Sequence, residues 1–254
     1  MNHTEARDQK RADGRGLRQL RPVRIESPFF RHAEGSASIR LGETWVVCAA
    51  TVEPRLPQWL RGASHGWVSA EYGLLPRSVP DRAPRNRISG RTLEIQRLVG
   101  RSLRAVTDLH RLGDRLILVD CDVIEADGGT RTAAVTAAYV ALHQLCRVLW
   151  ERGEITGFPL PDQLAAVSVG LKDGEVWLDL THAEDSAADV DFNVVMTGGD
   201  LLVEVQGTAE HQPFSRGDLG KMLTAARGGI RRLLRAQRRA LPWVAPPGTG
   251  RGEA

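Results

Sequence analysis

The feature that most constrains this chain is a strand followed by two glycines and a long apolar helix. The residues that alternate as one apolar face are Ile117, Val119, Cys121 and Val123, with Asp120 and Asp122 on the other face, as in a half-buried strand. Gly128 and Gly129 let the backbone turn tightly or adopt a positive φ. Thr130 is a suitable N-cap for the Ala- and Leu-rich helix expected over residues 130–149.

The turn between this strand and helix predicts an anion-binding site. The first N–H groups of a helix have no partners within it, and the helix dipole makes this end positive, which favours phosphate. Arg131 adds a planar guanidinium suited to phosphate oxygens. An ordinary turn with a surface arginine is the alternative, because glycine-rich turns are common. Asp120 and Asp122 are expected to support the turn and Arg131.

The net charge of +3 conceals a marked segregation of charge along the chain. Residues 77–104 carry eight arginines against two acidic residues, and residues 216–239 carry eight basic residues against one. Residues 173–191 carry seven acidic residues and no Lys or Arg. Such segregation suits a polyanion that must also meet a metal ion, although a solvated helix face is the alternative and is the interpretation we prefer for the basic cluster at 216–239.

The chain divides into two halves between two tails. We expect a flexible tail over 1–12, a first half over 13–152, a second half over 163–241 and a C-terminal tail over 242–254. A hairpin is predicted over 36–53, a strand over 66–75, a basic loop over 77–90, amphipathic helices over 92–106 and 218–241, and a linker over 153–162. The sequence shows neither a membrane span nor a signal peptide, and three scattered cysteines favour a reducing cytoplasm.

A short internal repeat relates the two halves. Each half contains a hairpin with a tryptophan in its second strand, Trp45 in one and Trp177 in the other. Aligning these tryptophans puts Val47 opposite Asp179. A buried carboxylate is costly unless it is paired, so the second half is predicted to contain a partner for Asp179 that the first half lacks.

The carboxylates around Asp179 predict a metal site of oxygen ligands. Asp185, Asp189 and Asp191 follow Asp179 with no nearby cysteine, which suits Mg²⁺ or Mn²⁺ rather than zinc. An acidic surface loop is the alternative, and for Glu184 and Asp189 it is the interpretation we prefer. The sequence contains no ATP P-loop and no Rossmann motif, and its histidines do not support a Ser-His-Asp mechanism.

Several motifs, in order, resemble bacterial ribonuclease PH. They are residues 31–36 (RHAEGS), 66–73 (GWVSAEYG), 89–104 (SGRTLEIQRLVGRSLR), 120–131 (DCDVIEADGGTR), 184–188 (EDSAA), 193–197 (NVVMT) and 204–210 (EVQGTAE). The resemblance implies an α+β fold of two similar βαβ-type halves, each like ribosomal protein S5 domain 2, with mixed sheets and packed helices. It also implies a homohexamer, a trimer of dimers, in the cytoplasm.

The same resemblance implies a phosphorolytic 3′→5′ exoribonuclease that uses inorganic phosphate as co-substrate and Mg²⁺ or Mn²⁺. Such an enzyme trims nucleotides beyond the CCA end of tRNA precursors and other structured RNA 3′ ends, releases nucleoside diphosphates, and adds nucleotides in reverse. Its phosphate ligands would be Arg91, Gly129, Thr130 and Arg131. Its catalytic and metal-binding pair would be Asp179 and Asp185, with Asp185 as the acid. Arg77, Arg82, Arg85 and Arg87 would bind the RNA backbone.

Two alternatives are left open, one an enzyme of the same lineage and the other a protein of a different class. One is a ring subunit of an exosome-like complex, and the other is a silent subunit that only binds RNA. The silent subunit would predict losses among Arg91, Arg131, Asp179 and Asp185, yet all four are present. The chain departs from the resemblance in its basic loop, which is about four residues shorter than usual. The role of Asp191 is left open.

Overall fold

Two β-sheets and four α-helices make up the described part of the chain. A computed structural model describes residues 11–85 and 89–241. The first sheet contains β1 (Val23–Glu26), β2 (Gly35–Leu41), β3 (Thr44–Val52), β4 (Trp67–Leu74) and β5 (Leu116–Glu125). Its order is β1-β2-β3-β5-β4, and only the β4–β5 pair is parallel. The second sheet contains β6 (Leu164–Lys172), β7 (Glu175–Leu178), β8 (Val190–Thr197) and β9 (Leu202–Ala209), in the antiparallel order β7-β6-β8-β9.

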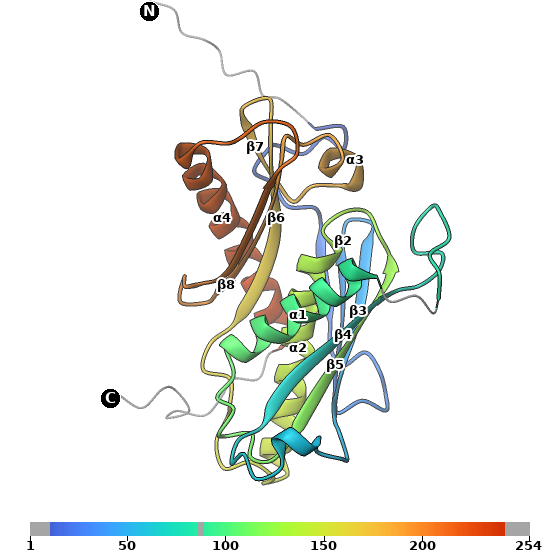
Figure 1. Cartoon of the computed structure of the whole chain (residues 1–254), viewed down its shortest axis with the longest axis vertical. Coiled ribbons are helices and arrows are strands. Elements are labelled where there is room, and N and C mark those ends of the chain that lie inside the picture. The colour runs from blue at the N-terminus through green and yellow to red at the C-terminus, as the bar shows by residue number, and fades with distance from the viewer. Residues whose placement is uncertain (1–10, 86–88, 242–254) are drawn as a thin grey trace, which may run out of the picture.

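The helices separate and cover these sheets (Figure 1). They are α1 (Gly90–Ala105), α2 (Thr130–Glu151), the single turn α3 (His182–Asp185) and α4 (Arg216–Ala240), besides a short 3-10 turn at Gln58–Leu60. The helices α1 and α2 share one apolar core with the first sheet. The side chains of β6 alternate between two cores. Ala165, Val167 and Val169 pack with α4 in a second core, whereas Leu164 and Ala166 belong to the core that contains α2. The helix α2 therefore lies between the two sheets.

Most of the predicted elements are confirmed. The strand β5 has the predicted alternation, with the side chains of Ile117, Val119 and Val123 fully buried. The helix α1 begins two residues earlier than expected because Ser89 caps it, accepting a hydrogen bond from the Thr92 N–H at 3.1 Å. The predicted repeat corresponds to two hairpins, β2–β3 and β6–β7, with Trp45 and Trp177 in the second strand of each.

The helix α2 is long and apolar enough to cross a membrane, yet it is the core helix of the fold. Of the 18-residue window that meets this criterion, 83% is buried inside the protein. Its length and composition are therefore explained by the two sheets that it separates.

The N-terminal segment is more ordered than the sequence predicts. The expected tail over 1–12 includes Arg11, whose side chain is fully buried against the second half. Residues 1–10 of that predicted tail lie outside the described residues, as does the predicted C-terminal tail over 242–254. Leu17 accepts a hydrogen bond from the Leu178 N–H at 2.8 Å, so residues 11–21 run along the second half before β1 enters the first sheet.

Candidate active site

The glycine turn after β5 forms the predicted left-handed connection to α2. Gly128 has a φ of 75° and Gly129 a φ of 66°, conformations that glycine adopts without steric cost. The expectation that Thr130 is the N-cap is wrong by one residue. Gly129 occupies the cap position in the left-handed conformation, and Thr130 is the first residue of the helix.

Thr130 is buried beside an aromatic hydroxyl of the first sheet. The Tyr72 hydroxyl donates to Thr130 Oγ1 at 2.9 Å. Burial raises the pKa of Tyr72, although the hydrogen bond to Thr130 and the charge of Arg91 oppose this effect. Tyr72 therefore stays protonated and can hold the Thr130 side chain in one orientation.

Arg131 reaches from the first half to the second. Its Nη1 donates to Glu94 Oε1 on α1 at 2.9 Å and to Gln206 Oε1 on β9 at 3.0 Å. These three residues line a cavity of about 380 Å³ together with Asp191, Asn193, Gly207 and Thr208. The cavity therefore lies where α1 and α2 of the first half meet β8 and β9 of the second.

Two carboxylates and two arginines interact beside this cavity. Burial raises the pKa of Asp185, while the charges of Arg91, His182 and Arg131 act in the opposite direction. Burial also raises the pKa of Asp191, and the nearby charge of Asp185 raises it further. Asn193 Nδ2 donates to Asp191 Oδ1 at 3.0 Å. The structure thus brings together Asp185, Asp191, Arg91 and Arg131, which are spread over 101 residues of sequence.

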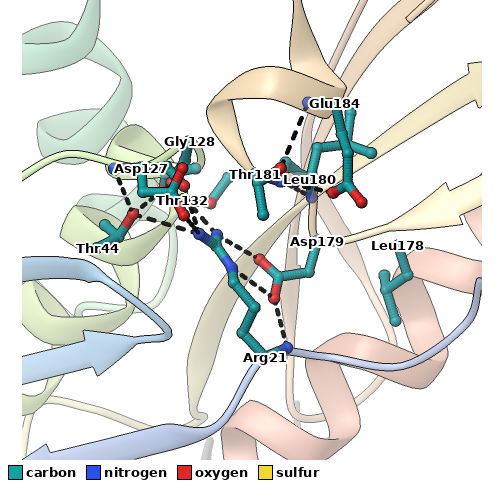
Figure 2. Close-up of polar contacts among 12 residues, drawn as sticks. Arg21, Thr44, Asp127, Gly128, Thr132, Leu178, Asp179, Leu180, Thr181 and Glu184 are labelled. Carbon is teal, nitrogen blue, oxygen red and sulfur yellow. Dashed lines mark hydrogen bonds and ion pairs between the residues drawn. The ribbon is translucent and has the colours of Figure 1, made fainter. Parts of the chain in front are cut away.

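Asp179, in contrast to Asp185 and Asp191, pairs with arginine of the N-terminal segment, as Figure 2 shows. Its side chain is fully buried, and its backbone leaves β7 with a φ of 58°. Asp179 Oδ2 accepts from the Arg21 backbone N–H at 2.7 Å and from Arg21 Nε at 3.1 Å, while Oδ1 accepts from Arg21 Nη2 at 2.7 Å. Arg15 Nη1 lies 3.4 Å from Oδ2. The buried carboxylate thus has a partner, as predicted, but the partner is arginine from the first half rather than a group of the second half, and it occupies both oxygens.

The short helix α3 is anchored to the same N-terminal segment. Glu184 accepts from Arg11 Nε at 2.7 Å and also pairs with Arg11 Nη2, and it closes a capping box with Thr181. Burial would raise the pKa of Glu184, but the hydrogen bonds from Arg11 and Thr181 outweigh burial and lower it. Glu184 is thus a structural anchor, and Asp185, which ends α3, is held in place by it.

The basic loop lies beside a second cavity. Arg77, Arg82 and Arg85 are exposed, and Arg77 Nη1 donates to the Pro80 carbonyl at 2.9 Å. Arg87 lies outside the described residues. A cavity of about 610 Å³ is lined by Arg85 of this loop, by Tyr72 at the end of β4 and by Ser89, Thr92 and Gln96 at the start of α1.

Asp120 and Asp122 do not support the turn or Arg131, contrary to expectation. They line a third cavity, of about 620 Å³, on the outer face of the first sheet with Glu71 and the segment 30–33. Burial raises the pKa of Asp120, and the charges of Asp122 and Glu71 raise it further. The side-chain contacts that hold Arg131 come instead from Glu94 and Gln206.

Sequence reasoning missed several residues of this site. Asp191 is named among the acidic residues with its role left open, and its place in the mostly apolar strand β8 is a signal that could have assigned it to the site. Tyr72, Glu94 and Gln206 lie in motifs that the sequence singles out, but no spacing indicates that they meet. Arg21 acts on a residue 158 positions away, so only the fold could have identified it.

Comparisons with known proteins agree with this fold. Residues 19–146 match domain 1 of the 3′ exoribonuclease family, and residues 162–229 match domain 2. The chain therefore belongs to the ribonuclease PH family of 3′ exoribonucleases. The ribonuclease PH of Moorella thermoacetica is 54% identical over 245 residues, covering 94% of this chain and 98% of that protein. The ribonuclease PH of Parasynechococcus marenigrum is 52% identical over 238 residues, covering 93% and 96%.

Solved structures share the fold at lower identity. The Archaeoglobus fulgidus exosome with RNA bound to the active site matches with a TM-score of 0.78 and 25% identity, covering 90% of this chain and 93% of that one. An archaeal exosome core matches with a TM-score of 0.71 and 23% identity, covering 92% of both. The predicted family and the predicted fold of two similar halves are both confirmed. The chain is a phosphate-dependent 3′→5′ exoribonuclease of tRNA processing, with inorganic phosphate as co-substrate.

Proposed function

We propose that this enzyme binds the attacking phosphate at the N-terminus of α2 and trims tRNA precursors there. The arrangement of Gly129, Thr130 and Arg131 at a left-handed helix start is the observation that carries the proposal. Backbone N–H groups and the helix dipole favour an anion at this point, and Arg91 and Arg131 supply positive charge. The phosphate is thereby held at the meeting point of the two halves.

The chemistry requires positioning and charge stabilisation, because phosphate is itself the nucleophile. An oxygen of inorganic phosphate forms a bond to the phosphorus of the last phosphodiester, and the bond from that phosphorus to the 3′ oxygen breaks. The products are a nucleoside diphosphate and an RNA shortened by one nucleotide, whose 3′ oxygen must gain a proton. Asp185 is our candidate for the donor, because burial raises its pKa.

A divalent cation fits the same carboxylates. Asp185 and Asp191 are half-buried, and their mutual repulsion raises the pKa of Asp191, a cost that a cation would relieve. Mg²⁺ typically takes one or two protein carboxylates and completes its shell with water and substrate phosphate, so this pair would be enough to hold it. Bound there, the ion would neutralise phosphate charge. Asp191 replaces Asp179 in the predicted pair, because arginine already occupies both oxygens of Asp179.

The RNA 3′ end would enter beside the basic loop. The cavity next to Tyr72 and Arg85 opens toward the start of α1, where Arg91 lies. Arg77, Arg82 and Arg85 are exposed and can contact the phosphate backbone with the salt dependence typical of such contacts. Arg87 belongs to the same proposal on the strength of the sequence alone.

A homohexamer in the cytoplasm completes the proposal. Exposed apolar side chains at Phe29, Phe30, Leu201, Leu202 and Val205 are suited to contacts between subunits. The archaeal relatives of the same fold are exosome assemblies. Light scattering on the purified protein would give six times the monomer mass if the assembly is correct and the monomer mass if it is not.

One assay tests the reaction. A 3′-extended tRNA is incubated with enzyme and Mg²⁺, with and without inorganic phosphate. Nucleoside diphosphates released only with phosphate are expected, and nucleoside monophosphates released without phosphate would refute phosphorolysis. D185N and D191N are each expected to lower kcat at least 100-fold while RNA binding persists. The exposed acidic residue Glu125 provides the control E125Q, which should retain wild-type turnover.

A further inference from the structure

Arg21 joins the phosphate turn of the first half to the second half. It lies just before β1, at the end of the N-terminal segment, and its side chain is only 3% exposed. On one side, its guanidinium contacts both oxygens of Asp179. On the other side it contacts the carbonyls of Asp127 and Gly128 in the turn (Figure 2). A single side chain thus bridges the two halves at the candidate active site.

Every N–H of this guanidinium has an acceptor. Nε donates to Asp179 Oδ2, and Nη2 donates to Asp179 Oδ1 and to the Gly128 carbonyl at 3.3 Å. Nη1 donates to the Asp127 carbonyl and lies 3.4 Å from Thr44 Oγ1. A guanidinium has five N–H groups in a fixed planar fork, so its position is fully determined by these contacts.

The carbonyls that Arg21 holds determine where the neighbouring amides point. In a trans peptide, the carbonyl oxygen and the following N–H point in opposite directions. Fixing the Gly128 carbonyl therefore fixes the Gly129 N–H, and fixing the Asp127 carbonyl fixes the Gly128 N–H. Thr44 reinforces the arrangement, since its hydroxyl donates to the Gly128 carbonyl at 2.7 Å and accepts from the Asp127 N–H at 3.0 Å.

The same turn is in direct contact with the segment that leads to Asp185. The His182 N–H donates to Asp127 Oδ1 at 3.1 Å. A methyl group added to Gly128 would lie 2.5 Å from the Leu180 carbonyl oxygen, so the two backbones touch. Because Asp179 directly precedes this segment, the pair of Arg21 and Asp179 fixes the distance between the phosphate turn and α3.

We infer that Arg21 is a positioning residue for phosphorolysis and that Asp179 serves it as a buried counter-ion. Arg21 orients the amides that receive phosphate and holds them in register with Asp185. This inference rests on the proposed function, because it concerns the site at which phosphate is proposed to bind. It assigns Asp179 no contact with the cation or with RNA.

The test compares R21K with R15K. Lysine keeps the charge opposite Asp179 but cannot serve a carboxylate and two carbonyls together. Arg15 is a matched control, because it is buried and also pairs with Asp179, while its hydrogen bonds go to Asp13, Gln19 and Asp179 and not to the turn. We expect R21K to raise the KM for phosphate at least tenfold with the KM for RNA unchanged, whereas R15K keeps the wild-type KM for phosphate. A purely structural role would lower the stability of both variants and leave the KM for phosphate alone in both.

A second readout does not depend on turnover. Inorganic phosphate should raise the melting temperature of the wild-type enzyme and of R15K in a concentration-dependent way, and R21K should need at least tenfold more phosphate for the same rise. Equal phosphate responses of R21K and R15K would overturn the inference. If R21K does not fold, D179N replaces it, because it withdraws one acceptor from Arg21.

The two roles of Asp179 give different results in D179N. A raised KM for phosphate, with the wild-type requirement for Mg²⁺, supports the role of Asp179 as the counter-ion of Arg21. Loss of turnover at saturating phosphate together with a raised requirement for Mg²⁺ would overturn it in favour of a metal ligand. Wild-type enzyme without phosphate-dependent activity would instead refute the proposed function itself, so the two failures are distinguishable.

Discussion

Replacing Gly128 with alanine tests how closely the two halves approach at the active site. The new methyl group would lie 2.5 Å from the Leu180 carbonyl oxygen, 2.7 Å from the Thr181 carbonyl carbon and 2.8 Å from the His182 nitrogen. All three are backbone atoms, which cannot rotate away as a side chain can. The φ of 75° adds a left-handed penalty of about 1 to 2 kcal/mol for any residue with a Cβ.

Gly174 is a matched control for this substitution. Its φ is 76°, and a methyl group there would meet no atom within 4 Å. G174A therefore carries the same left-handed penalty without the collision, and the overlap at Gly128 adds about 1 to 3 kcal/mol, as overpacking of a buried site does. With an m-value of about 3 kcal/mol/M, the urea midpoint of G128A should fall about 0.3 to 1 M below that of G174A.

The two variants should also differ in activity. The collision displaces the phosphate turn from α3, so G128A should raise the KM for phosphate, whereas G174A should keep it. Urea unfolding is followed by tryptophan fluorescence at one protein concentration, and phosphorolysis is followed at varied phosphate. Equal midpoints and equal KM values for G128A and G174A would refute the close contact between Gly128 and Leu180.

Three further predictions concern pH, a hydroxyl and salt. Burial lowers the pKa of His143 to about 4. Since the unfolded chain titrates near 6.5, it binds more protons between these values, and stability should fall by about 3 kcal/mol as pH drops through this window. Urea titrations at several pH values should show a weaker fall in unfolding free energy for H143Q than for wild type, while the exposed His110 variant H110Q keeps the wild-type fall. Y72F removes the donor to Thr130 and should raise the KM for phosphate about fivefold, since such a hydrogen bond contributes about 1 kcal/mol; an unchanged KM would contradict this. Replacing Arg82 and Arg85 by Gln should reduce the slope of log affinity for tRNA against log salt by about 1 to 2, measured by filter binding, and an unchanged slope would exclude both contacts.

Local patterns predicted the elements well. The alternation over residues 116–125 identified β5 because its one buried face follows the period of a strand. The glycine pair predicted a turn of positive φ, as both residues show. The exchange of Val47 for Asp179 between the repeats predicted a buried carboxylate with a partner, and Asp179 is indeed fully buried beside Arg21.

The sequence did not identify Arg21 as the partner of Asp179. A carboxylate paired with arginine and a carboxylate that holds a cation have the same residue type, and both lie in a strand pattern. The donor to Asp179 is 158 residues away, in a basic stretch before the first predicted hairpin that carries no sign of a link to the second half. Asp191 is the opposite case, because it stands out in a mostly apolar strand, yet only the fold brings it to Asp185 and Arg131. Pairings over such separations depend on the packing of the halves.

The position of α2 between the sheets determines whether the two halves can fold separately. Thr136 on α2 donates to the Ala166 carbonyl at 3.3 Å and accepts from the Ala166 N–H at 3.1 Å, so the middle of this helix is bonded to β6. Gln237 of α4, fully buried, donates to the Thr136 carbonyl at 3.0 Å and to the Leu164 carbonyl at 2.7 Å. Either half expressed alone would present water with an apolar helix or sheet surface and with broken backbone contacts. The two halves are therefore expected to fold as one cooperative unit, with a single unfolding transition, rather than as two separable domains.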